Sequence, residues 1–256
     1  LWQAEATEGI DFDLFNKQDY SRSFLASNMA EAISDVLYPN DDTDEGKKLR
    51  LKQQYFFVAA SLHSLGSWYR KRWGHDFSHF AGSYAVQLND THPTVAIPEL
   101  LRILMEEELM EFSDAFEVVK RVFAYTNHTV MAEALEKWNI SLFNDVIPQV
   151  YPYVIMINDA LRRELTTRGI SKEELPSYEI VSGGMVHMAR MAVYASHSTN
   201  GVAKIHTDIL KADTLKEWYA LYPERFNNKT NGITQRRWLA LCNPGLSKFI
   251  TDRIGD

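Results

Sequence analysis

The stretch that decides the fold is residues 84–98, Tyr-Ala-Val-Gln-Leu-Asn-Asp-Thr-His-Pro-Thr-Val-Ala-Ile-Pro. A short apolar run ends at Leu88, and residues 89–92 follow as the polar sequence Asn-Asp-Thr-His. Residues 99–108 then have the pattern of a helix. A strand, a polar loop and a helix in this order are typical of a parallel α/β sheet, which presents its functional groups at the carboxyl ends of its strands.

The same pattern returns further along the chain. Apolar or mixed runs at residues 121–125, 185–194 and 225–229 are each followed by a polar loop that contains asparagine. These loops are Thr-Asn-His-Thr at 126–129, Ser-His-Ser-Thr-Asn-Gly at 196–201 and Thr-Asn-Gly at 230–232. Several such loops at equivalent places predict one polar cleft along the edge of a sheet.

Size and composition exclude several classes of protein. The 256 residues are 45% hydrophobic and 24% charged, as in a globular protein that forms one large domain or two small ones. The net charge of -7 argues against a nucleic-acid surface, and no apolar run has the length of a membrane span. Cys242 is the single cysteine, so we expect no disulfide and no cysteine metal site. A single cysteine fits a reducing, cytoplasmic setting.

Apolar spacing predicts the remaining elements. Residues 20–37 and 46–72 have the pattern of helices, the second with a broad apolar face, and the acidic loop 40–46 separates them. We expect a surface loop at 171–178 and further helices at 132–138, 153–167, 202–211, 214–221, 234–241 and 244–254. Because the chain starts at Leu1 without a start signal, we expect it to be a piece of a longer protein.

Asp90 and His92 are the first candidate functional residues, together with His128, Glu133 and Glu136. A carboxylate two residues from a histidine resembles part of a metal site or an acid–base pair. However, the close spacing of a zinc hydrolase motif is absent. A hydrogen-bonding pocket for a sugar fits these residue types better, because hydroxyl groups need many oriented polar partners. Half-buried structural histidines remain the alternative.

Two further segments each allow a structural and a functional interpretation. The acidic loop 40–46 is either a solvated turn or a mobile lid over a polyhydroxylated ligand, and spacing alone favours the turn. Residues 230–234, Thr-Asn-Gly-Ile-Thr, form either a turn with a helix cap or part of the cleft. The sequence contains no dinucleotide fingerprint, nucleophile elbow or phosphate-binding P-loop.

Longer motifs resemble the α-glucan phosphorylases, the family of glycogen and maltodextrin phosphorylases. Val-Leu-Tyr-Pro-Asn-Asp at 36–41 leads into Glu-Gly-Lys-Lys-Leu-Arg-Leu-Lys-Gln-Gln-Tyr-Phe at 45–56. Gln-Leu-Asn-Asp-Thr-His-Pro at 87–93 and Ala-Tyr-Thr-Asn-His-Thr-Val at 124–130 follow. Near the end come Asn-Gly-Val-Ala-Lys-Ile-His at 200–206, Asn-Lys-Thr-Asn-Gly-Ile-Thr-Gln-Arg-Arg-Trp-Leu at 228–239 and Cys-Asn-Pro-Gly-Leu at 242–246. The resemblance covers essentially the whole chain, in order.

This resemblance implies an α/β chain that forms part of the N-terminal lobe of a two-lobed, GT-B type glycosyltransferase, helix-rich with a mainly parallel sheet. Residues 1–256 are then one incomplete domain, in which 20–37 matches the helix of the family's homodimer and 235–256 the crossing toward the second lobe. Family members release glucose 1-phosphate from glycogen or maltodextrin with inorganic phosphate. They use the 5′-phosphate of pyridoxal phosphate in proton transfer.

The resemblance also implies roles for individual residues. Asn231 and the backbone carbonyl of His128 match the family's contacts to the glucose hydroxymethyl group. Four residues match the lining of the cleft beside the sugar, namely Asp90, His92, Thr129 and Glu136. The gate over that cleft matches the loop of Asn40, Asp41, Asp42, Thr43, Asp44 and Glu45, and Arg50 lies on the helix that follows.

The chain departs from the family's pattern in the gate. Vertebrate members have Asn and two Phe where this chain has Asp42, Thr43 and Asp44, so the aromatic pair that stacks purine-type inhibitors is missing. The Asn contact to the sugar is then taken by Asp42 or lost. Gln235 replaces a frequent Pro, which we expect to be tolerated.

The chain also contains no stretch that resembles the Schiff-base lysine motif or the phosphate-binding motifs of the second lobe. We therefore expect this chain alone to be inactive and to bind no pyridoxal phosphate covalently.

Two other functions compete with a fragment of an active phosphorylase. One is an independent module that binds α-glucan or mediates dimerisation without catalysis. The other is a metal-dependent hydrolase that uses Asp90, His92 and His128, and it requires a bound metal ion.

Overall fold

A four-stranded parallel sheet forms the centre of the molecule, as described by a computed structural model that covers residues 2–255. Its order is β1-β2-β6-β7, so chain order and spatial order agree. Val86 pairs with Phe123, Thr126 with Asn200, and Gly201 with Asn228. The strands are β1 (Val86–Asn89), β2 (Phe123–Thr126), β6 (Thr199–Gly201) and β7 (Phe226–Asn228). The predicted α/β class with a mainly parallel sheet is confirmed.

The third predicted strand unit is wrong in detail. Its apolar run divides into β5 (Met185–His187) and the helix α11 (Met188–Tyr194), whereas the strand of the parallel sheet is β6, within the predicted polar loop. β5 belongs to a separate antiparallel sheet of order β3-β5-β4, with β3 (Lys137–Asn139) and β4 (Val181–Ser182). β3 also replaces the end of the helix predicted at 132–138, of which a single 3-10 turn remains at Ala132–Ala134.

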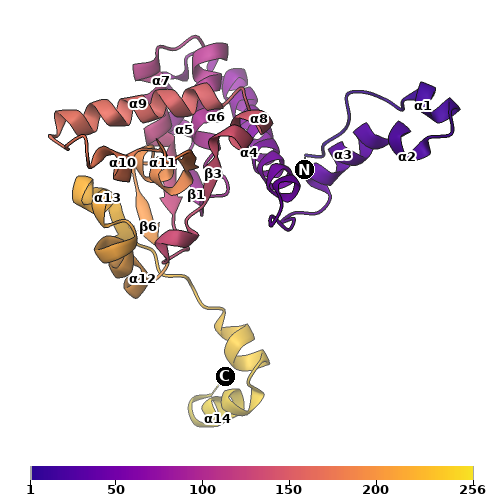
Figure 1. Cartoon of the computed structure of the whole chain (residues 1–256). Helices are drawn as coiled ribbons and strands as arrows, with labels where there is room; N and C mark the ends of the chain where they lie inside the picture. Colours follow the sequence, from indigo (N-terminus) through magenta and orange to yellow (C-terminus); the bar gives the residue numbers. More distant parts are fainter. Residues whose placement is uncertain (1, 256) are drawn as a thin grey trace.

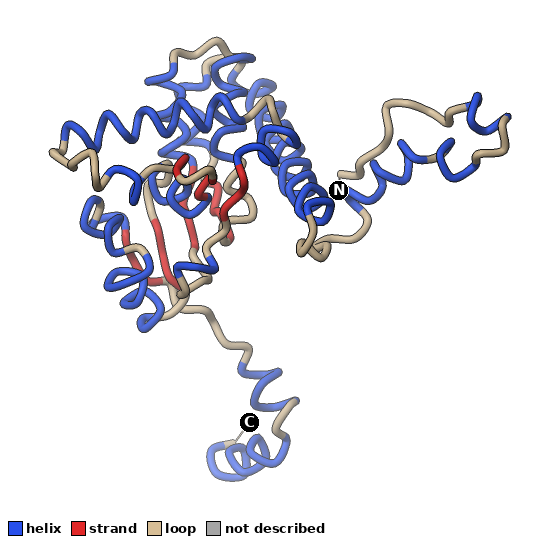
Figure 2. Tube along the Cα trace, viewed as in Figure 1, coloured by secondary structure: helices blue, strands red, loops and turns tan. Residues whose placement is uncertain are grey.

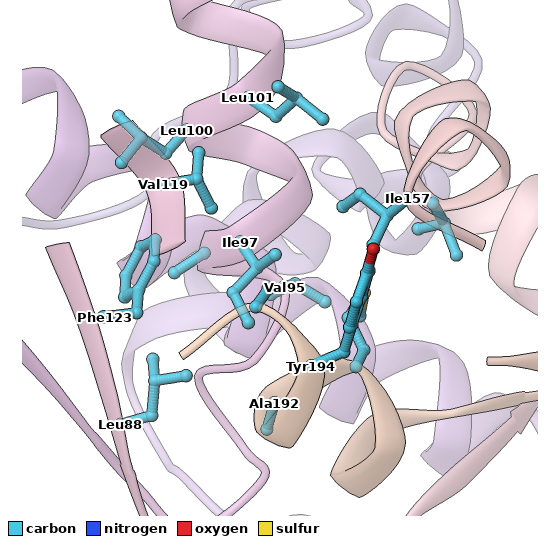
Figure 3. Close-up of a cluster of buried hydrophobic side chains, with 14 of the residues drawn as sticks. Leu88, Val95, Ile97, Leu100, Leu101, Val119, Phe123, Ile157, Ala192 and Tyr194 are labelled. Atoms are coloured by element: carbon cyan, nitrogen blue, oxygen red, sulfur yellow. The ribbon is translucent and has the colours of Figure 1, made fainter. Parts of the chain in front are cut away.

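Helices cover the sheet and enclose its core. In Figure 3, Leu88 of β1 and Phe123 of β2 lie below Leu100, with Ile97 beside Phe123, and these side chains are at most 2% exposed. The helices of this layer are α6 (Ala96–Arg102), α7 (Phe112–Val122), α9 (Tyr151–Thr167) and α11. Nearby lie α5 (Phe80–Ser83), α8 (Ile140–Val146) and α10 (Leu175–Tyr178), the last inside the predicted loop 171–178.

The longest helix, α4 (Asp44–Trp73), lies beside the sheet and begins two residues before the predicted start at residue 46. Thr43 caps it, because its side chain accepts a hydrogen bond from the Gly46 amide (3.3 Å). The acidic residues Asp44 and Glu45 in its first turn and basic residues in its last turn suit the helix dipole. The acidic segment 44–46 is thus the start of a helix rather than loop.

Two segments project from this body, as Figures 1 and 2 show. The N-terminal arm contains α1 (Phe12–Asn16), α2 (Tyr20–Ser23) and α3 (Leu25–Ser34), so the single helix predicted at 20–37 is broken at Phe24 and ends early. The C-terminal arm contains the π-helix η6 (Arg236–Leu241) and α14 (Pro244–Ile254), neither of which has a buried residue. The helices before it are α12 (Lys204–Ile209), the π-helix η4 (Leu210–Thr214) and α13 (Lys216–Leu221).

Within residues 2–255, no helix has both the length and the apolar composition needed to cross a bilayer.

Candidate functional site

The carboxyl ends of the parallel strands carry a continuous polar network. Thr126, at the end of β2, donates a hydrogen bond from Oγ1 to Oδ1 of Asn200 on β6 (2.9 Å). Gln87 of β1 donates from Nε2 to Thr126 Oγ1 (2.8 Å), and the Asn200 amide group donates to the carbonyl of Gly201 (2.9 Å). These bonds pair the side chains of Gln87, Thr126 and Asn200, which stabilises their polar groups at the strand ends.

Asp90 lies in the turn after β1, in a left-handed conformation with φ +65°. Aspartate tolerates this region better than most residues. Its Oδ1 accepts a hydrogen bond from the Thr91 amide (2.7 Å), and its own amide donates to the carbonyl of Thr126 (2.9 Å). The turn therefore fastens the end of β1 to the end of β2 and places the Asp90 carboxylate at this edge.

A cavity of about 410 Å³ lies between the start of α4 and the loops after β1 and β2. Its wall includes predicted cleft residues, the carboxylate of Asp44 in the first turn of α4, and residues that were not selected from the sequence. The predicted residues in the wall are Asp41, Asp44, Asp90, His92, Thr129, Glu133 and Glu136. The unselected polar residues in the wall are Thr91, Lys47, Arg50, Lys137 and Asn139, and Trp138 also lines it.

Glu136 is the polar centre of this cavity. Its Oε1 accepts a hydrogen bond from Gln54 Nε2 (2.9 Å) and lies 3.9 Å from Arg50 Nε and 3.8 Å from His92 Nδ1. Burial alone would raise the pKa of Glu136, but His92 and then Gln54 outweigh burial, so the pKa is lowered. Since 3.8 Å exceeds a hydrogen bond, we attribute the effect of His92 to charge.

The same contact acts on the imidazole of His92. Glu136 raises the pKa of His92 in spite of the half-burial of the ring. Both shifts favour the ion pair. Glu136 Oε2, His92 Nδ1 and Gln54 Oε1 are buried and have no hydrogen-bond partner among the described residues. Buried polar groups without a partner are uncommon, and three of them occur together in this cluster.

His128 and Asn231 lie outside the cavity wall, at the surface of the same sheet edge. The ring of His128 is bound through Nε2 to Asn89 Oδ1 (2.7 Å). The backbone amide of Asn231 donates a hydrogen bond to the carbonyl of Val202 (3.0 Å). The structure thus brings the loops of Asp90, His128 and Asn231 to one edge but separates the last two from the cavity.

The gate loop folds back onto α4. Asn40 accepts a hydrogen bond from the Asp42 amide (2.8 Å), and Asp41 accepts one from Arg50 Nη1 (3.1 Å). A Cβ on Gly46 would lie 2.0 Å from the carbonyl oxygen of Asn40, so only glycine permits this close approach. The side chains of Asn40, Asp42, Thr43 and Glu45 do not line the cavity.

The predicted metal and cofactor chemistry can be compared with these side chains. Among residues 2–255, no group of three or more His, Cys, Asp or Glu side chains could hold a metal ion, so Asp90, His92 and His128 do not form a ligand set. Every described lysine is half-buried or exposed. A lysine that forms an imine is typically desolvated in an apolar pocket, so none of the described lysines fits an imine with pyridoxal phosphate.

The residues that support Glu136 and the loops of the site were not predicted from the sequence. Gln54 was not selected, and Arg50 was noted without a role, although they stand one turn apart on α4 and both face Glu136. Their spacing of four residues on a mostly apolar helix face is a signal that could have identified them. His206, buried behind the loop after β6, was also missed. Its ring contacts Asn127 and Val202, and the spacing of residues in the sequence does not reveal such contacts.

Comparison with known proteins agrees with this arrangement. The family model described as carbohydrate phosphorylase matches residues 1–256. Over 267 aligned residues the chain is 44% identical to the brain form of glycogen phosphorylase from Mus musculus, and to the muscle forms from Bos taurus and Homo sapiens. Each match covers 100% of this chain and 32% of the relative, so the chain spans about a third of their length. The chain belongs to the carbohydrate phosphorylase family.

Proposed function

We propose that this chain forms the sugar-binding side of the catalytic cleft of an α-1,4-glucan phosphorylase. That enzyme would release glucose 1-phosphate from glycogen or maltodextrin with inorganic phosphate, in the cytoplasm and as a homodimer. The observation that carries the proposal is the convergence of polar loops from the parallel strands at one sheet edge. Open α/β sheets bind their ligands at this edge.

In this proposal the residues of the chain position the sugar by hydrogen bonds. The carbonyl of His128 and the side chain of Asn231 bind the hydroxymethyl group of the terminal glucose. Asp90, His92, Thr129 and Glu136 line the space beside the ring, and the gate loop, including Asp42, covers it. Neutral contacts suit a transition state with oxocarbenium character, because they hold the ring rigidly while other groups supply charge.

Pyridoxal phosphate would be held by the part of the enzyme that this chain does not span, and its 5′-phosphate would assist proton transfer there. Residues 1–256 would then be one incomplete domain, with 235–256 leading toward that part. The chain alone would be inactive and would bind no pyridoxal phosphate covalently. Formation of a lysine adduct on incubation with the cofactor, seen by absorbance and mass, would contradict this.

The decisive experiment is phosphorolysis of maltoheptaose by a full-length phosphorylase that contains this chain, as wild type, Asn231→Ala and His128→Ala. Loss of a hydrogen bond used in the transition state costs about 1–3 kcal/mol, so we expect Asn231→Ala to be roughly ten- to a hundred-fold slower. His128→Ala should have a smaller effect, since its carbonyl remains. Full activity in both variants would instead support a non-catalytic α-glucan-binding or dimerisation module.

A further inference from the structure

A buried chain of hydrogen bonds joins the loops that follow β2, β6 and β7. The first residue in this chain of hydrogen bonds is Asn127, in the loop after β2, and it is fully buried. Its side-chain nitrogen donates to Tyr125 Oη (3.0 Å), and its Oδ1 accepts from the Thr129 amide (2.9 Å). The same Oδ1 lies 3.0 Å from Nε2 of His206 on α12. The backbone around His128 is therefore held on one side by Asn127 and, through it, by His206.

The other ring nitrogen of His206 determines the direction of these bonds. The Val202 amide donates to His206 Nδ1 (3.1 Å). A backbone amide can only donate, so Nδ1 is an acceptor and the ring proton of neutral His206 is on Nε2, where it is donated to Asn127. Burial lowers the pKa of His206, which favours the same neutral form. Both ring nitrogens are thus fully used.

The chain of bonds continues to Asn231. The carbonyl of Val202 accepts a hydrogen bond from the backbone amide of Asn231 (3.0 Å). One imidazole therefore connects the loop that carries the His128 carbonyl with the loop that carries Asn231. These loops are otherwise far apart in the sequence, and both lie at the exposed sheet edge. A shift of either loop would be transmitted through His206 to the other.

We propose that His206 is a positioning residue that sets the distance between the His128 carbonyl and the Asn231 side chain, and so determines selectivity for a sugar with a hydroxymethyl group. The inference rests on the proposed function. His206 is buried, with 7% of the residue exposed, and acts through Asn127 and Val202 rather than on the sugar. Geometry of this kind matters because a misplacement of a binding group by a fraction of an ångström weakens its hydrogen bond.

Two substitutions separate the two functions of the ring. In His206→Asn the amide oxygen takes the place of Nδ1 and can accept from Val202, but the side chain no longer reaches Asn127. In His206→Gln the amide nitrogen takes the place of Nε2 and can donate to Asn127, while the acceptor for Val202 is lost. Tyr222→Phe is a matched control, because it also removes a hydrogen bond of a buried ring, to Glu164 (2.9 Å), but at the opposite end of β7.

The test compares phosphorolysis of two maltooligosaccharides by the full-length enzyme, one ending in glucose and one ending in 6-deoxyglucose. We expect the ratio of their kcat/KM values to fall about ten-fold in both His206 variants and to stay at the wild-type value in Tyr222→Phe. Active His206 variants with the wild-type ratio would overturn the inference and leave the proposed function intact. A wild-type enzyme without phosphorolysis would instead count against the proposed function.

A second measurement needs no substitution. Nitrogen NMR of the imidazole of His206 in the wild-type chain should show the Nε2–H tautomer near pH 7, with Nδ1 hydrogen-bonded to the Val202 amide. A ring protonated on Nδ1 under these conditions would contradict the arrangement, whether or not the variants fold.

Discussion

At the scale of single residues, His187 at the end of β5 is a partly buried titratable group that lies near a positive charge. Its Nε2 lies 3.2 Å from Ser182 Oγ, and Arg190 donates a hydrogen bond to the same oxygen (3.2 Å). Burial first, and then the charge of Arg190, lower the pKa of His187 to about 4. The ring is therefore neutral in the folded protein under conditions in which a free histidine takes up a proton.

We predict that this histidine makes the chain less stable in mild acid. In the unfolded state the ring titrates near its ordinary pKa of about 6.5, whereas in the folded state it takes up its proton only near the lowered value. Stability is therefore greatest above about pH 6.5 and falls as the pH decreases toward the folded pKa. Urea unfolding at about pH 7 and about pH 5.5 should show a loss that is about 1 kcal/mol larger in wild type than in His187→Gln.

The control is His197→Gln, which replaces an exposed histidine and should leave the pH dependence as in wild type. Equal losses in wild type and His187→Gln would show that the ring is protonated in the folded state and would contradict the prediction.

At the scale of elements, the apolar helices could be predicted from the sequence and the central strands only in part. α4, α9 and α14 have long periodic patterns, which is why their predicted bounds lie within two residues of the observed ones. β6 was missed because Thr199, Asn200 and Gly201 are polar or small, whereas strands inside a parallel sheet usually read as apolar. Their burial depends on partners such as Thr126 and Gln87, which a single sequence does not place beside them.

The apolar run 188–194 was predicted as part of a strand because nearly all of its residues are apolar. As α11 it is buried on nearly all sides, so it lacks the polar face that marks a helix.

The candidate site could also be predicted only in part. The polar loops at strand ends were predictable, but the cavity around Glu136 needs α4, β3 and the loop after β1 together.

The gate loop and α4 behave as one element because Arg50 lies between two carboxylates. It donates to Asp41 of the gate (3.1 Å) and lies 3.9 Å from Glu136 of the cavity. We predict that Arg50→Gln and Asp41→Asn each loosen the gate, with no further loosening in the double variant, because both remove the same contact. For a partly exposed ion pair the effect is modest, about 0.5–1 kcal/mol. Amide hydrogen exchange of residues 40–43 should accelerate by roughly two- to five-fold.

Lys204→Gln provides the control for this prediction, since it removes a surface ion pair with Asp208 on α12, away from the gate. Additive effects of the two gate substitutions, or unchanged exchange in both, would show that Arg50 does not restrain the loop through Asp41.

At the scale of the whole molecule, the two arms expose large apolar side chains to solvent. The N-terminal arm presents Tyr20, Leu25 and Met29, each at least half exposed, and the C-terminal arm presents Trp238 and Phe249. Neighbouring exposed apolar residues of this size usually mark interaction surfaces. We therefore propose that this arm, which includes the segment 20–37 interpreted from the sequence as a dimer-type helix, is where a second copy binds.

We predict that the 256-residue chain associates with itself in a concentration-dependent manner, and that Leu25→Glu with Met29→Glu shifts it toward the monomer. The two positions lie four residues apart on one face of α3, so two charges there would oppose burial of that face. Sedimentation velocity over a concentration series would measure the change. The matched control is Leu109→Glu, because this leucine is equally apolar and 82% exposed but lies on the central body. If the control disrupts association as strongly as the double variant, or if wild type stays monomeric throughout, the N-terminal arm is not the interface.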